Sequence, residues 1–251
     1  MSADDFKSAG GLAGPDLQRF YEEKEAVYHS QEARAGGREK LVLELFPPEK
    51  PLHVLDVGCG SGGFLRILKD LGHEAVGLEI SVKAVEAANQ SGVKAFVGNP
   101  ETKAGLDDVG KDFDVITLLD VLEHTFDPPQ VLRHLAMLLK PDGCIIASVP
   151  NLGCFTARWK ILWGQFPFEP SGIFDSGHIR WFTRVNLTAY VQRAGGFMLQ
   201  KCSATGIPPF SLRGYWRLKD CHDFFFTRLA RFWPSLFGHQ LVFKIAPAKP
   251  A

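Results

Sequence analysis

The sequence LHVLDVGCGSGGF, residues 52–64, decides the fold of this chain. Its apolar run over residues 52–57 predicts a buried parallel strand, followed by a tight turn and a helix that begins near Gly62. Glycines in such a turn adopt backbone angles that other residues resist, and they let a ligand approach the main chain closely. Open α/β sheets bind ligands at the carboxyl ends of their strands. The stretch therefore predicts a site for a nucleotide-like molecule.

The rest of the chain alternates strands and helices, as in a doubly wound α/β sheet. Helices are expected from Ser81 to about residue 91, over 128–139 and over 185–194. A turn over 140–143 separates the second of these from the next strand. Further strands are expected at 74–79, 94–98, 113–119, 144–149, 197–203 and 239–245.

Length and composition favour a single cytoplasmic domain. The 251 residues suffice for one sizeable core, and the 28 basic and 28 acidic residues balance, which gives no argument for nucleic acid. The five cysteines are scattered and odd in number, which favours a reducing compartment over a zinc site. We expect no signal peptide and no membrane-spanning run.

Two cofactor classes fit the glycine turn. Gly58, Gly60 and Gly63 match the dinucleotide pattern G-x-G-x-x-G, and Glu79 follows at the spacing of a ribose-binding acid. Asp56 argues against a dinucleotide, because an acid beside a pyrophosphate is unfavourable, whereas it suits a ligand that carries an ammonium and a sulfonium.

Three segments resemble the class I methyltransferases that use S-adenosylmethionine. Residues 54–62 resemble the first motif of that family, residues 112–128 its motif after strand four, and residues 138–143 its segment before strand five. They cover about residues 52–151 in the order and spacing of the family. The resemblance implies S-adenosylmethionine as cofactor, S-adenosylhomocysteine as product, and a seven-stranded, mostly parallel sheet of order 3-2-1-4-5-7-6 whose last strand is antiparallel.

The resemblance also implies which residues contact the methyl donor. Glu79, at the end of the second strand, is expected to accept hydrogen bonds from both ribose hydroxyls. Asn99 is placed to meet the adenine edge, where family members often have an acid instead. The full set of expected donor contacts is Asp56, Gly58, Cys59, Gly60, Gly62, Glu79, Ile80, Asn99, Asp120 and Val121.

Two segments are candidates for the chemistry. His124 follows strand four and is either a general base or a residue that shapes the loop and contacts the donor. Residues 174–183, FDSGHIRWFT, resemble an Asp-x-x-His-x-Arg-aromatic-Phe-Thr segment of one methyltransferase branch. There His178 is a candidate base, Asp175 would orient it, and Arg180 would hold an anionic group. The alternative is that Arg180 pairs with Asp175 and pins the loop.

Insertions flank these segments. Residues 151–183 form a substrate insertion within a core of residues 48–203, and Arg158 and Trp159 are its expected substrate contacts. Residues 1–47 are expected to form a tail and helical cap. Residues 204–251 add an aromatic, basic insertion before the final strand, and its part over 205–238 suits an anionic membrane surface, a homodimer contact or packing on the domain.

The expected function is O-methylation of a small-molecule hydroxyl on a saccharide, a quinone or a lipid-linked precursor. The alternatives are N-methylation of a small molecule and a SAM-binding interaction module that transfers no methyl group. Neither a metal nor a nucleic-acid partner is expected.

Overall fold

The computed structural model describes residues 37–49, 51–206 and 227–248. The expected helical cap lies outside these ranges up to residue 36, as do residues 207–226 of the basic, aromatic insertion. Membrane contact and dimer formation through that insertion stay predictions.

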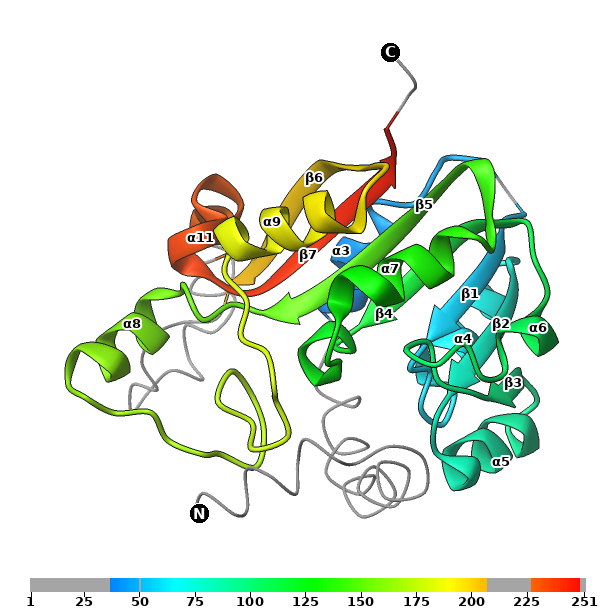
Figure 1. Ribbon diagram of the computed structural model, residues 1–251, viewed down its shortest axis with the longest axis horizontal. Helices are drawn as coiled ribbons and strands as arrows, with labels where there is room; N and C mark the ends of the chain where they lie inside the picture. The colour runs from blue at the N-terminus through cyan, green and yellow to red at the C-terminus, as the bar shows by residue number, and fades with distance from the viewer. Residues whose placement is uncertain (1–36, 50, 207–226, 249–251) are drawn as a thin grey trace.

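A seven-stranded sheet of order β3-β2-β1-β4-β5-β7-β6 organises the chain (Figure 1), which confirms the expected fold. Strands β1 to β4 pair parallel with their neighbours, as does β4 with β5, while β7 runs antiparallel to both β5 and β6. The strands are β1 His53–Val57, β2 Glu74–Glu79, β3 Lys94–Val97, β4 Phe113–Leu119, β5 Leu139–Pro150, β6 Phe197–Gly206 and β7 Gly238–Pro247.

Helices connect these strands where the sequence pattern changes period. Ser81 caps the helix after β2 by accepting a hydrogen bond from the Ala84 N–H, and Asp127 caps the helix after β4 in the same way through Gln130. The elements are α3 Arg38–Leu43, α4 Gly63–Asp70, α5 Val82–Gln90, α6 Leu106–Val109, the short 3₁₀ turn η1 Leu122–His124, α7 Pro128–Ala136, α8 Phe155–Leu162, α9 Arg184–Ala194 and α11 Pro234–Phe237.

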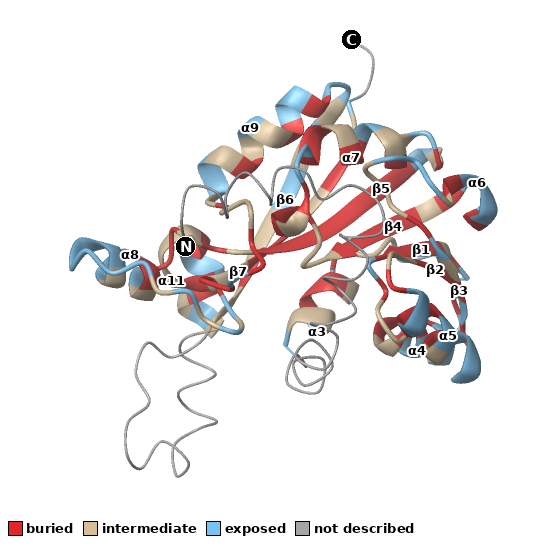
Figure 2. Cartoon of the chain, turned by 60° about the horizontal axis from the view of Figure 1, so that its bottom comes forward, coloured by how far each residue is buried: buried red, intermediate tan, exposed pale blue. Residues whose placement is uncertain are grey.

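The core lies on both faces of the sheet, because successive side chains of a strand point to opposite sides. In β1, Val54 packs with α3 and α4, whereas Leu55 packs with α7 and α9. Both residues are fully buried, so the central strands are apolar on both faces, as a parallel sheet covered by two helical layers requires (Figure 2).

One turn was placed wrongly. We expected residues 140–143 to precede β5, but β5 begins at Leu139, which pairs with Phe113, and Cys144 pairs with Val115. The intervening residues form an irregular bulge, which the ion pair between Lys140 and Asp114, 2.7 Å long, ties to β4. The helix before it ends at Ala136 instead of residue 139.

Within the ranges that the structure describes, no helix is long and apolar enough to cross a bilayer.

Candidate active site

The glycine turn after β1 needs glycine for two separate reasons. Gly58, Gly60 and Gly62 have positive φ angles of 74°, 52° and 82°. A Cβ at Gly58 would also lie 2.5 Å from Cγ2 of Val121, in the loop after β4. The turn is therefore closely packed against that loop, and two of the expected donor contacts, Gly58 and Val121, lie side by side.

Glu79, at the carboxyl end of β2, holds this turn. Its Oε2 accepts a hydrogen bond from the Gly60 N–H at 3.1 Å, and its Oε1 accepts from the N–H groups of Ile80 and Ser81 at 2.7 and 3.0 Å. A carboxylate has about four lone-pair positions, so it can accept hydrogen bonds from several partners at the same time. The arrangement suits the expected ribose contact.

Asp56 and Cys59 both have buried side chains. Asp56 is 2 % exposed, and its carboxylate accepts a hydrogen bond from Oγ1 of Thr117 in β4 at 2.6 Å. Cys59 is buried against β2, where a Cβ on Gly77 would lie 2.4 Å from its Sγ. Asp56 therefore supports the turn from beneath, and contact of Asp56 or Cys59 with the methyl donor stays a prediction.

Asn99 follows the end of β3, and its side chain holds the turn that comes next. Its Oδ1 accepts a hydrogen bond from the Glu101 N–H at 2.9 Å, and its main chain pairs with Ala104. This places the residue at the same edge of the sheet as Glu79, as the expected adenine contact requires. That contact stays a prediction.

Asp120 is the strained residue at the end of β4. Its φ of 59° is uncommon for a residue with a side chain. Its carboxylate pairs with the Arg38 guanidinium at 2.5 Å and accepts hydrogen bonds from Oγ of Ser148 at 2.9 Å and from the Gln240 amide. Four elements thus meet at one side chain.

Arg38 is a site residue that the sequence analysis missed. It opens α3, 82 positions before its partner Asp120, and no local motif connects the two. Burial opposes its charge, but the carboxylates of Asp120 and Glu39 outweigh that effect and raise the pKa of Arg38 above its ordinary value. A permanent cation therefore neutralises Asp120.

Beyond Asp120, the buried Glu123 and His178 and the half-buried His124 form a polar cluster. One potential ligand atom from each residue lies within 4.8 Å of the others, and the two imidazole centroids are 4.9 Å apart. Burial, and secondarily the charge of His178, lowers the pKa of His124 to about 4. Burial and the nearby Asp120 carboxylate raise the pKa of Glu123 well above its usual range. At neutral pH His124 is consequently neutral.

The loop over residues 173–180, which carries His178, is held against η1, which carries Glu123 and His124. The backbone N–H groups of Ile179 and Arg180 both donate to the Glu123 carbonyl at 3.0 Å. Asp175 accepts from the Gly177 N–H at 2.6 Å, and Arg180 donates to the Phe126 carbonyl at 2.7 Å. The four residues that we singled out in these two segments, including His124, thus come together, but Asp175 and Arg180 engage the main chain and shape the loop.

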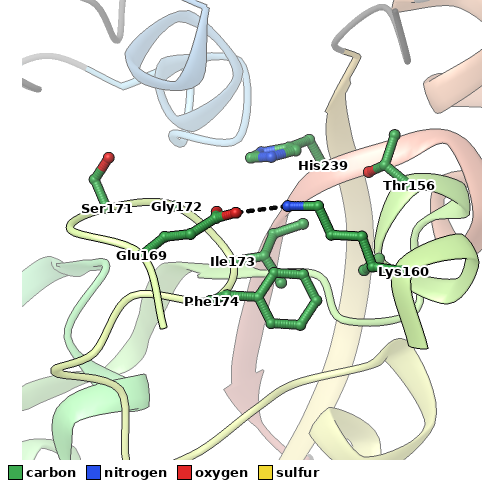
Figure 3. Close-up of a pocket in the computed structure, with 9 residues that line it drawn as sticks. Thr156, Lys160, Glu169, Ser171, Gly172, Ile173, Phe174 and His239 are labelled. Atoms are coloured by element: carbon green, nitrogen blue, oxygen red, sulfur yellow. Dashed lines mark hydrogen bonds and ion pairs between the residues drawn. The ribbon is translucent and has the colours of Figure 1, made fainter. Parts of the chain in front are cut away.

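A pocket of about 250 Å³ lies between α8, the segment over residues 169–174 and His239 of β7 (Figure 3). Lys160 of α8 and Glu169 form an ion pair of 2.6 Å across it, and burial lowers the pKa of His239 on its wall. Ile173 also lines the pocket, and its carbonyl lies 3.2 Å from Nδ1 of His178. The residues around the pocket are Thr156, Ala157, Lys160, Glu169, Ser171, Gly172, Ile173, Phe174 and His239.

The two expected substrate contacts on α8 lie elsewhere. Arg158 donates from Nε to the Gly153 carbonyl at 2.5 Å, which ties the helix to its own beginning. Trp159 is 53 % exposed and stacks on Phe155 with 6.2 Å between ring centroids. Lys160 and Thr156 of the same helix line the pocket instead. The sequence did not show which side of α8 faces the pocket, so these two residues were not predicted to line it.

Comparisons with known proteins agree with this geometry. A family model described as a methyltransferase domain matches residues 28–200. The ubiquinone biosynthesis O-methyltransferase of Coxiella burnetii strain RSA 331 is 28 % identical over 163 residues, which are 63 % of this chain and 68 % of that protein. The protein of the same name from Azorhizobium caulinodans is 29 % identical over 178 residues, or 68 % of each chain.

Solved structures show the same fold. A SAM-dependent methyltransferase of Thermotoga maritima, described as a possible histamine N-methyltransferase, superposes with a TM-score of 0.62 at 20 % identity over 92 % of this chain and 97 % of that one. The plantazolicin methyltransferase BamL, solved with S-adenosylhomocysteine, superposes with a TM-score of 0.63 at 17 % identity over 93 % of this chain and 94 % of that one.

The glycine turn and Glu79 fit S-adenosylmethionine, because a main chain that admits close approach adjoins a carboxylate, a group that accepts strong hydrogen bonds from ribose hydroxyls. The chain belongs to the methyltransferase-domain family and is a class I S-adenosylmethionine-dependent methyltransferase.

Proposed function

We propose that this enzyme methylates a hydroxyl oxygen of a small molecule. The observation that carries the proposal is the polar cluster of Glu123, His124 and His178, buried between the loop after β4 and the loop over residues 173–180. A hydroxyl must lose its proton when it is methylated, so a site for hydroxyls needs groups that promote that loss. An amine needs little or no such help.

S-adenosylmethionine supplies an activated methyl group on a sulfonium. The acceptor oxygen forms a bond to the methyl carbon, the carbon–sulfur bond breaks with its electron pair on sulfur, and the hydroxyl proton leaves toward the cluster. The chain contributes by positioning, which is worth on the order of 7–11 kcal/mol in favourable intramolecular reactions. Glu79 and the glycine turn would hold the donor, and the pocket beside Lys160 would hold the acceptor.

The acceptor class follows from the pocket and the relatives together. The relatives named above act in ubiquinone biosynthesis as O-methyltransferases, and the chain shares less than a third of its residues with them. Phe174 offers an aromatic wall, and Lys160 lies 5.2 Å above its ring. We infer a ring-bearing acceptor, such as a phenol or a hydroquinone.

A screen with isotopically labelled donor tests this function. The purified protein is incubated with methyl-deuterated S-adenosylmethionine and matched pairs of acceptors, such as a catechol and the corresponding o-phenylenediamine. We expect mass spectrometry to find the label on oxygen. Label on nitrogen alone would show an N-methyltransferase. Binding of S-adenosylhomocysteine without transfer to any acceptor would favour a non-catalytic binding module.

A further inference from the structure

Glu123 has a buried carboxylate that no described residue satisfies. It is 1 % exposed, and neither carboxylate oxygen has a hydrogen-bond partner among the described residues. Burying a polar group without a hydrogen bond costs roughly 1–3 kcal/mol, and a charge costs more. Native structures seldom retain such a group unless something outside the polypeptide satisfies it.

The two histidines present the nitrogen atoms that a metal ion would use. Nδ1 of His124 lies 3.0 Å from the Gly177 carbonyl, and Nδ1 of His178 lies 3.2 Å from the Ile173 carbonyl. A carbonyl oxygen only accepts hydrogen bonds, so Nδ1 carries a proton in each ring, and when the ring is neutral its lone pair is on Nε2. Metal-binding histidines show this same pattern, in which a carbonyl fixes the tautomer and the ring orientation.

The distances are close to those of a coordination site. The three potential ligand atoms lie within 4.8 Å of one another, and bonds of about 2.1 Å in a tetrahedral site would bring them to about 3.4 Å. Closing that gap takes side-chain rotations of about an ångström. The carbonyls of Ile173 and Gly177, which accept from the two rings, belong to one short loop, residues 173–177. A small movement of this loop would therefore shift the hydrogen-bond partners of both rings together.

We propose that Glu123, His124 and His178 form a binding site for a divalent transition-metal ion of the Zn²⁺ type. Two imidazoles and one carboxylate are the protein ligands of several catalytic zinc sites, whereas Mg²⁺ prefers oxygen ligands and water. The surroundings suit a cation, because Arg38 balances only one of the two carboxylates Asp120 and Glu123. The proposal departs from the sequence-based expectation that the chain has no metal site.

The role of the ion rests on the proposed function. Three protein ligands leave a fourth position open, as in catalytic zinc sites. An ion there would polarise an acceptor hydroxyl and favour its deprotonation. His124 and His178 would then serve as ligands, and neither would be the general base.

Cobalt binding tests the site without reference to activity. The full-length protein is stripped with a chelator and titrated with Co²⁺, followed by visible d–d absorption and by mass spectrometry of the bound metal. We expect about one equivalent to bind, with no thiolate charge-transfer band, and Zn²⁺ to displace it. No binding, or a thiolate band in place of an imidazole-type spectrum, would overturn the proposal.

Variants place the ion. Glu123→Gln and His178→Gln should each weaken Co²⁺ binding at least about tenfold. His134→Gln is the matched control, because His134 is also held through Nδ1 by a carbonyl, that of Pro100 at 2.7 Å, outside the cluster. Equal affinity in all three variants would contradict the assignment.

Thermal unfolding separates loss of the site from loss of the fold. Without metal, Glu123→Gln should unfold at the wild-type temperature or above it, since the change replaces a buried acid with a neutral amide. With Zn²⁺, the wild type should gain thermal stability that this variant does not gain. A gain of the same size in both would exclude Glu123 as a ligand. If methyl transfer persists in a protein that binds no metal, the metal proposal fails and the proposed function stands.

Discussion

A side chain at position 58 would meet the loop that follows β4. Gly58 combines a φ of +74° with a neighbour, Val121, only 2.5 Å from where a Cβ would lie. Gly72 has a similar φ of +82° but open space around it. The two glycines therefore separate the cost of the backbone conformation from the cost of the contact.

We expect Gly58→Ala to destabilise the protein by about 2 kcal/mol or more, because overpacking adds to a left-handed penalty of about 1 kcal/mol. Gly72→Ala should lose only the smaller amount. Urea unfolding measures both, and titration with S-adenosylhomocysteine should show weaker binding for the Gly58 variant alone. Equal losses in the two variants would show that Val121 yields easily.

His239 on the wall of the pocket makes stability depend on pH. Burial lowers its pKa below the ordinary value of about 6.5, so the unfolded chain takes up a proton before the folded one does as the pH falls. The free energy of unfolding should therefore decrease below about pH 6.5, and His239→Gln should remove part of that decrease. Parallel urea titrations at pH 7.5 and 5.5 test this. The same pH dependence in wild type and variant would contradict it.

The first helix of the described chain is fixed to the site by one ion pair. Arg38 of α3 reaches Asp120 at the end of β4, and both side chains are largely shielded, 15 % and 32 % exposed. The pair between Arg231 and Glu44 is more open, with side chains 50 % and 41 % exposed. Shielded pairs are costly to break, whereas exposed pairs contribute about 0–1 kcal/mol.

We expect Arg38→Met to lower the free energy of unfolding by about 2 kcal/mol and to weaken S-adenosylhomocysteine binding, because Asp120 loses the cation that holds it. Arg231→Met should change stability by less than about 1 kcal/mol and leave ligand binding intact. Chemical unfolding and calorimetric titration of both variants make the comparison. If both variants bind the ligand as the wild type does, Asp120 has no part in the donor site.

The sequence could predict elements whose signals are local. The bounds of β2 and β4 came from apolar runs that end in turn residues, and the helix of Val82–Gln90 from the capping serine before it. The bulge at residues 140–143 was predicted to be a turn, because Pro141 and Gly143 signal turns. The pairing of Leu139 with Phe113, which extends β5 through this region, depends on tertiary contacts that the local sequence does not show.

The same distinction between local signals and tertiary contacts applies to the site residues. The glycines and Glu79 belong to one contiguous motif, whereas Arg38, His239 and the pocket side of α8 depend on contacts between distant segments. The Glu123–His124 pair was visible in the sequence. Only the structure shows that no described residue donates a hydrogen bond to the Glu123 carboxylate and that the pair lies close to His178.

In the whole molecule, the sheet brings the expected methyl-donor site and the polar cluster to the edge formed by the carboxyl ends of its parallel strands. The glycine turn, Glu79 and Asn99 follow β1, β2 and β3, and the polar cluster follows β4. Parallel strands place all of these carboxyl ends together, which is how one sheet can position a donor beside an acceptor. We therefore expect S-adenosylmethionine to bind at that edge.

Calorimetric titration with S-adenosylhomocysteine, with NADH run alongside, tests whether the methyl donor binds at this edge of the sheet. Glu79→Gln changes the expected ribose contact, and Glu74→Gln, at the exposed start of the same strand, is the control. We expect micromolar binding of S-adenosylhomocysteine by the wild type and by Glu74→Gln, binding at least about tenfold weaker by Glu79→Gln, and no binding of NADH. Binding of NADH, or equal affinity for S-adenosylhomocysteine in both variants, would contradict the assignment of this edge as the methyl-donor site.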